Sequence, residues 1–199
     1  MTSKVLPLRR IEGTAAELSD EVLVAGCGLG DMAALGALFD RFHDSVRRFL
    51  ARIAGADDRD LDDLVQTTFE TVLRAARRYD GRASVRTWIF GIANNVVRHH
   101  VRSEVRRKRL VSVVVAPDAS TDTGAAASEH ERAARLHAAI LALSPKLREV
   151  FVLIYLEGVP GTEAARVLGI REGAVWKRLH DARVQLRDAL ARDAGEVSP

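Results

Sequence analysis

The sequence predicts an all-α protein of two small helical domains joined by a flexible linker. Apolar residues recur three or four positions apart through most of residues 19–110 and again through 129–193, which is the period of an amphipathic helix. Between these stretches, residues 111–128 lose the period and contain mainly small residues with Pro117 and Gly124, a composition typical of a linker. Residues 111–115 also read as a short strand, but nothing obvious pairs with it.

Helix start and stop signals divide the first domain, which follows a loose extension over residues 1–18. Ser19 is expected to cap a short helix, and Asp31 to open a long helix that ends at Gly55. Clustered aspartates then begin a third helix, because carboxylates favour the positive N-terminal end of the helix dipole. Ser84 is expected to cap a fourth helix, which runs on into an arginine cluster.

The second domain, residues 129–193, shows a different set of signals and is followed by a tail over residues 194–199. Ser144 and Pro145 read as a cap and a first helical position, and that helix is expected to stop near Gly158. A short helix, a turn at Gly169 and a last helix over residues 172–191 complete the domain.

Charge and cysteine content indicate a soluble cytoplasmic protein with a separate partner for each sign of charge. The net charge is only +3, but the acidic and basic residues are segregated along the chain, and a basic stripe suits phosphate. Cys27 is the only cysteine, which fits a reducing compartment. No N-terminal apolar run resembles a signal peptide, and the longest apolar stretch, 150–156, is too short to span a bilayer.

Residues 163–179 are typical of a helix-turn-helix, in which a short helix, a turn with glycine and a longer helix follow each other. On the longer helix, Val175 and Leu179 share one face, while Lys177 and Asp181 lie on the opposite face and are free to enter a major groove. An ordinary helical hairpin with a solvated charged face is the alternative.

The stretch from Tyr79 to Arg109 interleaves aromatic residues, arginines and asparagines. Rings stack on bases, amides read base edges and arginines hold the backbone, so this mixture favours capture of single-stranded DNA. Its rings are Tyr79, Trp88 and Phe90. Alternatively, Trp88 and Ile92 belong to the core and the arginines form a solvated face; for Trp88 alone its spacing favours the core.

The aspartate cluster before residues 63–69 has two remaining interpretations, a helix-dipole cap and a protein-docking surface. A calcium loop is rejected, because its sixth position would be Asp63 rather than glycine and its twelfth Phe69 rather than glutamate. The sequence has no Gly-Lys dipeptide and therefore no P-loop. Adjacent His99 and His100 lack partners at ligand spacing, so no metal is expected. No Ser/His/Asp or Cys/His arrangement is found either, so no cofactor or enzyme activity is expected.

The order of these motifs resembles that of extracytoplasmic-function sigma factors of the sigma-70 family. The resemblance rests on DLVQTTF, on YDGRASVRTW with AxN after it, and on LSPKLREVFVLIYLEG followed by AARVLGIREGAVWKRLHDAR, and it covers about residues 20–191. It implies sigma regions 2 and 4, a function in promoter-specific initiation, and core RNA polymerase, promoter DNA and an anti-sigma factor as partners. The linker would thread toward the polymerase active site.

The resemblance also assigns roles to individual residues. Docking on the β′ clamp helices would use Asp62, Asp63, Gln66, Thr67 and Glu70. The −10 element would be opened and held by Tyr79, Arg82, Arg86, Trp88, Asn94, Asn95, Arg98 and Arg102. The −35 element would be read, beside the β flap, by Arg171, Glu172, Ala174, Trp176, Lys177, Arg178, His180 and Asp181.

Some positions differ from the usual family pattern. Pro160-Gly161 replaces a polar cap, Arg171 stands where serine commonly caps the recognition helix, and Trp176 and Asp181 occupy positions that are often basic. Two other functions remain open at this point: a dimeric helix-turn-helix repressor or activator, and an adaptor that has lost DNA binding. The N-terminal motifs disfavour both.

Overall fold

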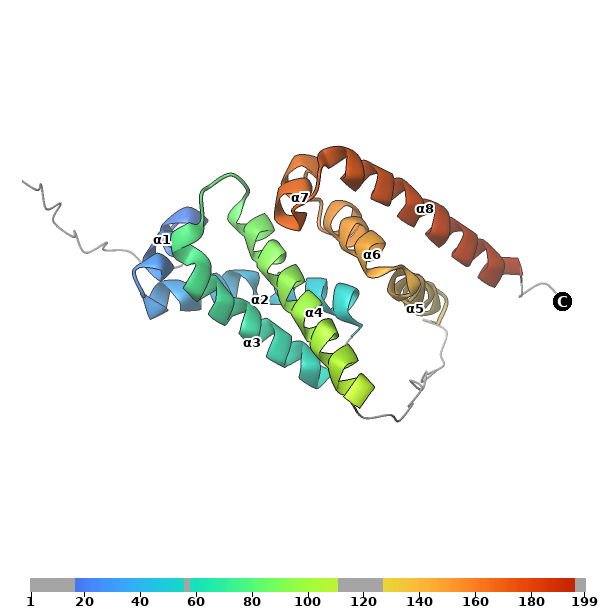
Figure 1. Cartoon of the computed structure of the whole chain (residues 1–199), viewed down its shortest axis with the longest axis horizontal. Helices are drawn as coiled ribbons and strands as arrows, with labels where there is room; N and C mark the ends of the chain where they lie inside the picture. Colours follow the sequence, from blue (N-terminus) through green and yellow to red (C-terminus); the bar gives the residue numbers. More distant parts are fainter. Residues whose placement is uncertain (1–16, 56–57, 111–126, 196–199) are drawn as a thin grey trace, which may run out of the picture.

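The structure is a computed structural model of the 199-residue chain that describes residues 17–55, 58–110 and 127–195. These ranges contain only helices and loops and no strand, which confirms the predicted fold class. An N-terminal bundle, α1–α4, lies beside a C-terminal bundle, α5–α8 (Figure 1). The α-helices are α1 (Asp20–Gly28), α2 (Met32–Ala54), α3 (Asp58–Ala75), α4 (Val85–Leu110), α5 (Ala127–Ala142), α6 (Pro145–Phe151), α7 (Gly161–Leu168) and α8 (Glu172–Gly195).

Several sequence predictions lie outside the described residues. These are the loose extension up to residue 16, the linker and its short strand over 111–126, and the tail from residue 196. Helix α5 begins at Ala127, inside the last residues predicted as linker, and α8 continues four residues beyond the predicted end at 191.

The predicted capping residues are found at the ends of α1, α2 and α4. The Ser19 hydroxyl accepts a hydrogen bond from Val22 N at 3.4 Å, and the Asp31 carboxylate accepts from Ala33 N at 2.8 Å. Ser84 Oγ accepts from Thr87 N at 3.2 Å. Gly55 ends α2 at φ 61°, a left-handed conformation that glycine adopts without steric cost. Each cap satisfies a backbone group that the helix itself leaves unpaired.

The start of α6 departs from the prediction in one respect. The helix begins at Pro145 as expected, but the Ser144 side chain makes no capping hydrogen bond. Beyond Phe151 the helix widens into a π-helical segment, η3 (Val152–Leu156), in which Glu157 N donates to Val152 O at 3.0 Å. The sequence did not indicate this segment, because an uninterrupted apolar run has no period to distinguish helix types. The wider turn is often found at functional positions.

The core of the N-terminal bundle is built on α2 and α4. Phe49 and Phe90 are fully buried and stack with their ring centroids 4.7 Å apart, with Leu38 and Ile89 also fully buried. In the C-terminal bundle, Val175, Leu179, Ala182 and Leu186 form the buried face of α8, as the sequence predicted. None of the described helices is long and apolar enough to cross a membrane.

The two bundles pack directly against each other, with α4 against α7 and α2 against α5 and α6 (Figure 1). Gly91 allows α4 and α7 to approach closely. A Cβ at this position would lie 2.9 Å from the Cβ of Val167 on α7. Gly55 likewise faces the side chain of Leu141 on α5. We call this contact surface the bundle interface.

Candidate nucleic-acid interface

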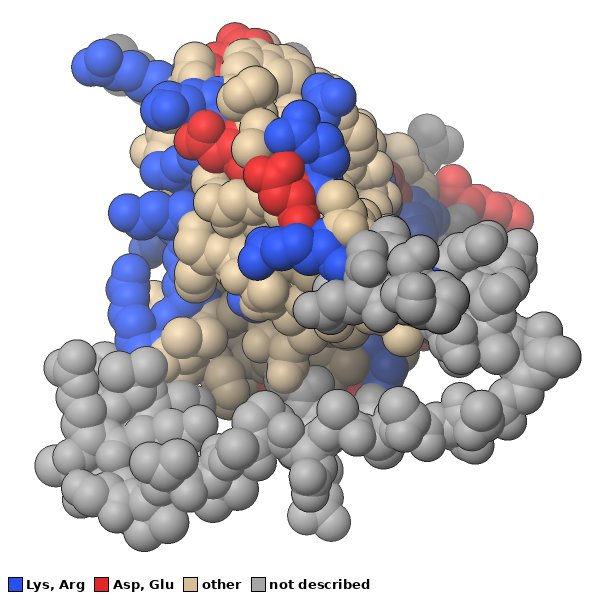
Figure 2. All heavy atoms as spheres, turned by 90° about the vertical axis from the view of Figure 1, so that its right-hand side faces the viewer, with Lys and Arg blue, Asp and Glu red and all other residues tan. Residues whose placement is uncertain are grey.

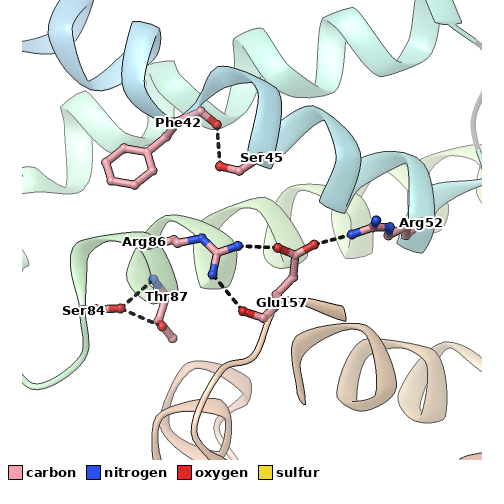
Figure 3. Close-up of polar contacts among 7 residues, drawn as sticks. All are labelled: Phe42, Ser45, Arg52, Ser84, Arg86, Thr87 and Glu157. Carbon is pink, nitrogen blue, oxygen red and sulfur yellow. Dashed lines mark hydrogen bonds and ion pairs between the residues drawn. The ribbon is translucent and has the colours of Figure 1, made fainter. Parts of the chain in front are cut away.

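A buried carboxylate of the C-terminal bundle holds two arginines of the N-terminal bundle. The Glu157 side chain, just after the π-helical segment, is only 5 % exposed. It accepts hydrogen bonds from Arg52 Nη1 on α2 at 2.7 Å and from Arg86 Nη2 on α4 at 2.6 Å, and its backbone oxygen accepts from Arg86 Nη1 at 2.8 Å (Figure 3). The two guanidinium groups therefore neutralise the charge that Glu157 brings into the bundle interface.

A second carboxylate makes a two-pronged contact further along α4. Arg98 Nε and Nη2 donate to the two oxygens of Glu149 at 2.8 and 2.5 Å. The Glu149 side chain is 7 % exposed, and its hydrogen bonds raise the pKa of the Arg98 guanidinium. Paired arginine–carboxylate bonds of this kind are both strong and directional.

Further contacts close the two ends of the bundle interface. Ser84 N and Oγ both donate to the Glu163 carboxylate, at 3.2 and 3.4 Å. Arg166 donates to the backbone oxygen of Arg82, and Arg148 Nη1 donates to that of Ile53 at 2.9 Å. Carboxylates of the C-terminal bundle thus contact the N-terminal bundle at Arg52, Arg86 and Arg98 and at the start of α4.

The residues predicted for the −10 element fall into a covered group and an exposed group. Arg86 and Arg98 are held in the bundle interface, and Asn94 is 1 % exposed, so none of the three is free in this arrangement. Asn95, Arg82 and Arg102 are exposed. Their contact with DNA stays a prediction for both groups.

The aromatic rings of this stretch are buried or half-buried, whereas stacking on bases requires exposed rings. Phe90 is fully buried against Phe49, so including it among the base-stacking rings was wrong. Trp88 is half-buried, with its ring centroid 5.1 Å from that of Tyr79, which agrees with the core interpretation of its spacing. The Tyr79 hydroxyl donates to Ala83 O at 2.7 Å, and burial raises its pKa.

Helices α7 and α8 form the predicted helix-turn-helix, with Gly169 in the left-handed region at φ 66° between them. Along α8 the predicted reading face is accessible: Arg171, Glu172, Lys177 and His180 are exposed, and Ala174, Arg178 and Asp181 are half-buried. Lys177 Nζ and Asp181 Oδ2 form an ion pair at 3.5 Å, one helical turn apart.

Trp176 accounts for the unusual residues at the start of α7. Its ring, 49 % exposed, lies over Gly161, where a Cβ would come within 2.6 Å of a ring atom. Its indole nitrogen donates to Glu172 Oε1 at 3.3 Å. Pro160, in the capping position, makes no side-chain capping bond. A glycine at position 161 is therefore required by the tryptophan on the recognition helix.

Helix α3 presents the side chains predicted to dock on the polymerase. Asp62, Asp63, Gln66, Thr67 and Glu70 are all exposed along one side of it. Gln66 Nε2 donates to Glu70 Oε1 at 3.0 Å, and Arg47 on α2 pairs with Asp62 at 3.5 Å. Beside these residues, Phe39 and Phe69 line a cavity of about 560 Å³, which gives this polar surface an apolar neighbour.

Sequence reasoning missed the acidic residues of the bundle interface. Glu149 and Glu157 were read as parts of helices, and Arg52 and Arg148 were given no role. A weak signal was present, since Glu149 and Glu157 flank an almost purely apolar run, where a charge needs a partner. On the face drawn in Figure 2, Lys and Arg gather along one edge, with acidic side chains among other basic ones near its centre.

Two helical bundles, the second ending in an exposed helix-turn-helix, define a two-domain DNA-binding protein. Residues 38–107 match the family model of sigma-70 region 2, and residues 133–186 that of sigma-70 region 4. The chain belongs to the sigma-70 family, among its extracytoplasmic-function members, and it is a sigma factor, which joins RNA polymerase and acts in promoter-specific initiation.

Similar proteins match over almost the whole chain. The extracytoplasmic-function sigma factor SigC of Mycobacterium tuberculosis is 32 % identical over 184 residues, covering 91 % of this chain and 96 % of SigC. The sigma factor CnrH of Cupriavidus metallidurans is 33 % identical over 187 residues, covering 89 % of this chain and 97 % of CnrH.

Solved structures show the same architecture. CnrH in complex with the cytosolic domain of CnrY has a TM-score of 0.65 at 30 % identity, covering 87 % of this chain and 98 % of CnrH. The sigma factor RpoE of Bartonella quintana, solved with the anti-sigma factor NepR, has a TM-score of 0.66 at 22 % identity and covers 77 % of this chain and 94 % of its own. At this lower identity, the similarity to RpoE shows a shared fold. The family models, SigC and CnrH favour a sigma factor over a stand-alone repressor.

Proposed function

We propose that three surfaces of this sigma factor carry separate steps of initiation. The exposed side of α3, from Asp62 to Glu70, docks on the β′ clamp helices of the polymerase. The face of α4 from Arg86 to Arg102, with Tyr79 and Arg82 before it, opens and holds the −10 element. The exposed face of α8 from Arg171 to Asp181 reads the −35 element beside the β flap.

The observation that carries this proposal is the anion-binding character of the α4 face. Arg98 donates two guanidinium nitrogens to the two oxygens of the Glu149 carboxylate, and Arg86 donates two to Glu157, one to its carboxylate and one to its backbone oxygen, all at 2.5–2.8 Å. A phosphate offers the same kind of paired oxygen acceptors. Arg102, one turn beyond Arg98, is exposed and extends this row toward solvent. Such contacts position DNA rather than read its sequence.

This proposal requires the two bundles to separate before promoter binding. Glu149 and Glu157 occupy the guanidinium groups that would hold the promoter backbone, and α7 covers the middle of α4. Promoter DNA and the C-terminal bundle therefore compete for the same face. Binding of α3 to the polymerase is compatible with either state, because its predicted docking residues are exposed in the closed one.

We also infer an anti-sigma partner, a cytoplasmic location and a regulatory rather than catalytic role. The relatives CnrH and RpoE were solved with CnrY and with the anti-sigma factor NepR. Sigma factors are regulatory subunits that act where the polymerase is, and the residues described here supply binding surfaces.

Transcription by the reconstituted holoenzyme tests the docking surface. Asp63→Lys reverses a charge on the proposed docking side of α3, whereas Asp44→Lys makes the same change on α2, where the side chain is well exposed. We expect Asp63→Lys to lower core polymerase affinity at least about tenfold, which is 1.4 kcal/mol, while leaving the thermal unfolding temperature unchanged. Equal core affinity and equal promoter-specific transcript from both variants would remove α3 as the docking surface.

A further inference from the structure

The bundle interface contains a cavity of about 570 Å³, formed by residues from both bundles. Its walls come from the end of α2, the middle of α4, the start of α6, and α8 with the turn before it. Apolar side chains such as Ile53, Val97 and Leu168 line part of it. Its size falls within the range of roughly 300–1,000 Å³ that accommodates a small organic ligand, far more than one water molecule occupies.

The charges around this cavity are unbalanced. Its polar lining consists of Arg98, Arg102, Lys146, Arg148 and Arg178, the amide of Asn94 and a single carboxylate, Glu149. Glu149 is already bound by Arg98 through both of its oxygens. Arg102, Lys146 and Arg178 form no ion pair with any carboxylate in the part of the chain that the structure describes. An excess of cations around a partly apolar space favours an anionic ligand.

Two buried polar groups in the cavity lining lack partners. The Asn94 side chain is 1 % exposed, and neither its Nδ2 nor its Oδ1 has a hydrogen-bond partner. Arg148 donates its terminal nitrogens to the backbone oxygens of Ile53, Leu141 and Leu143, but its Nε is buried and unpartnered. Burial lowers the pKa of this guanidinium. These atoms are out of contact with solvent, so the cations that a ligand in the cavity can reach are Arg102, Lys146 and Arg178.

We propose that this cavity binds a small organic anion, a carboxylate or phosphate monoester with a compact apolar body. The anionic head contacts the accessible cations Arg102, Lys146 and Arg178, and the apolar body contacts Val97, Leu168 and their neighbours. Because both bundles form the walls, the site exists only while the bundles are closed. Any ligand that binds only the closed form stabilises it by mass action. If the α4 contacts proposed above are correct, this anion is a negative effector of promoter binding.

Isothermal titration calorimetry on the free full-length chain tests the site with four probes. Phenyl phosphate and benzoate carry the two anionic heads on an apolar ring, benzyl alcohol carries a similar ring without charge, and inorganic phosphate carries the head alone. We expect saturable binding of phenyl phosphate, of benzoate or of both, and binding at least about tenfold weaker for the neutral ring. The better head identifies the ligand class. The measurement needs neither polymerase nor promoter, so its failure is separate from a failure of the proposed promoter contacts.

Variants separate the cavity from general attraction to a basic protein. Lys146→Gln removes one exposed cation of the cavity lining, so we expect an unchanged unfolding temperature together with about tenfold weaker anion binding. Glu157→Gln lies outside the cavity lining but loosens the bundle interface, and it should also weaken binding. Arg192→Gln removes a positive charge near the end of α8 and should leave binding unchanged.

Three results would overturn the proposal. The first is no saturable heat with phenyl phosphate or benzoate, and the second is binding that Lys146→Gln or Glu157→Gln leaves intact. The third is equal affinity for inorganic phosphate and phenyl phosphate, which would remove the apolar body from the ligand class.

Discussion

At the scale of single residues, Glu157 is a buried charge whose ion-pair partners lie in the other bundle. Its carboxylate is nearly excluded from solvent and is stabilised by two guanidinium groups that come from different helices of the other bundle. A buried carboxylate is unfavourable unless such partners remain in place. The charge on Glu157 therefore favours the closed arrangement, and loss of that charge leaves Arg52 and Arg86 without an acceptor of equal strength.

We predict that Glu157→Gln opens the bundle interface. The amide keeps the shape but turns an NH₂ group toward a guanidinium, and charge-assisted hydrogen bonds worth about 1.5–3 kcal/mol are lost. The ratio of closed to open molecules should fall by about ten- to a hundredfold. Small-angle X-ray scattering should show a larger radius of gyration than for Asp188→Asn, which removes an exposed charge that pairs only with its neighbour Arg187. Identical scattering from both variants would argue against Glu157 as the closing contact.

Asp181 belongs to the same scale because one carboxylate on the recognition helix can change base preference. It pairs with Lys177, and exposed pairs of this kind are weak enough to rearrange on DNA. A carboxylate accepts a hydrogen bond from the exocyclic amine of cytosine and repels phosphate. We predict that Asp181→Ala relaxes preference at one −35 base pair by roughly 1–3 kcal/mol. Transcription of a randomised −35 library measures this, and unchanged preferences would leave Asp181 as a surface charge.

At the scale of elements, the crossing of α4 and α7 depends on the absence of one side chain. Gly91 lies in the first third of α4, inside the helix, where glycine is about 1 kcal/mol less favourable than alanine. The reason for glycine is the contact with Val167, which leaves no space for a Cβ. The helix therefore gives up some intrinsic stability so that the two bundles can approach closely.

We predict opposite effects of Gly91→Ala on the helix and on the bundle interface. The N-terminal bundle should gain up to about 1 kcal/mol of intrinsic helix stability, while the clash with Val167 separates the bundles. Adding Val167→Gly, which removes the Cβ that the new side chain meets, should restore closure, as measured by scattering. Gly36→Ala is the matched control, because a Cβ at Gly36 on α2 meets no atom within 4 Å, so only the helix gain should appear. Closure that survives Gly91→Ala unchanged would contradict the assigned contact.

At the scale of the whole molecule, the two bundles form a closed state that competes with promoter DNA. Carboxylates from α6 and from the segment after it occupy arginines on α4 that would otherwise face phosphates. When only a fraction of molecules is open, the apparent affinity for a ligand of the open state is the intrinsic affinity multiplied by that fraction. The strength of the bundle interface therefore sets how well the free factor binds DNA.

We predict that a variant with both Glu149→Gln and Glu157→Gln binds a single-stranded −10 oligonucleotide at least about tenfold more tightly than the unmodified chain, without polymerase. Fluorescence anisotropy at fixed salt measures the affinity. The control carries Asp44→Asn and Asp188→Asn, which change the net charge equally but lie on exposed surfaces. Equal gains in both variants would mean that general electrostatics, rather than opening, causes the effect.

The sequence by itself determined the elements of this protein. Helix starts at Ser19, Asp31 and Ser84, the end at Gly55 and the helix-turn-helix followed from capping and periodicity, which act over a few residues. The motif order led to the family and to its function for the same reason, since each motif is a short local pattern. The exposed side of α3 and the buried face of α8 also agree with their periodicity.

Only the tertiary structure decided how those elements use their charges. Arg98 and Glu149 are 51 residues apart in the chain, and Arg52 and Glu157 are 105 apart, so no local pattern connects them. The burial of Asn94 and Phe90, the glycine contact at Gly91 and the cavity between the bundles depend equally on which helices pack together. An arginine on a helix face favours any nearby anion, and its partner, carboxylate or phosphate, is set by the surface that reaches it in three dimensions.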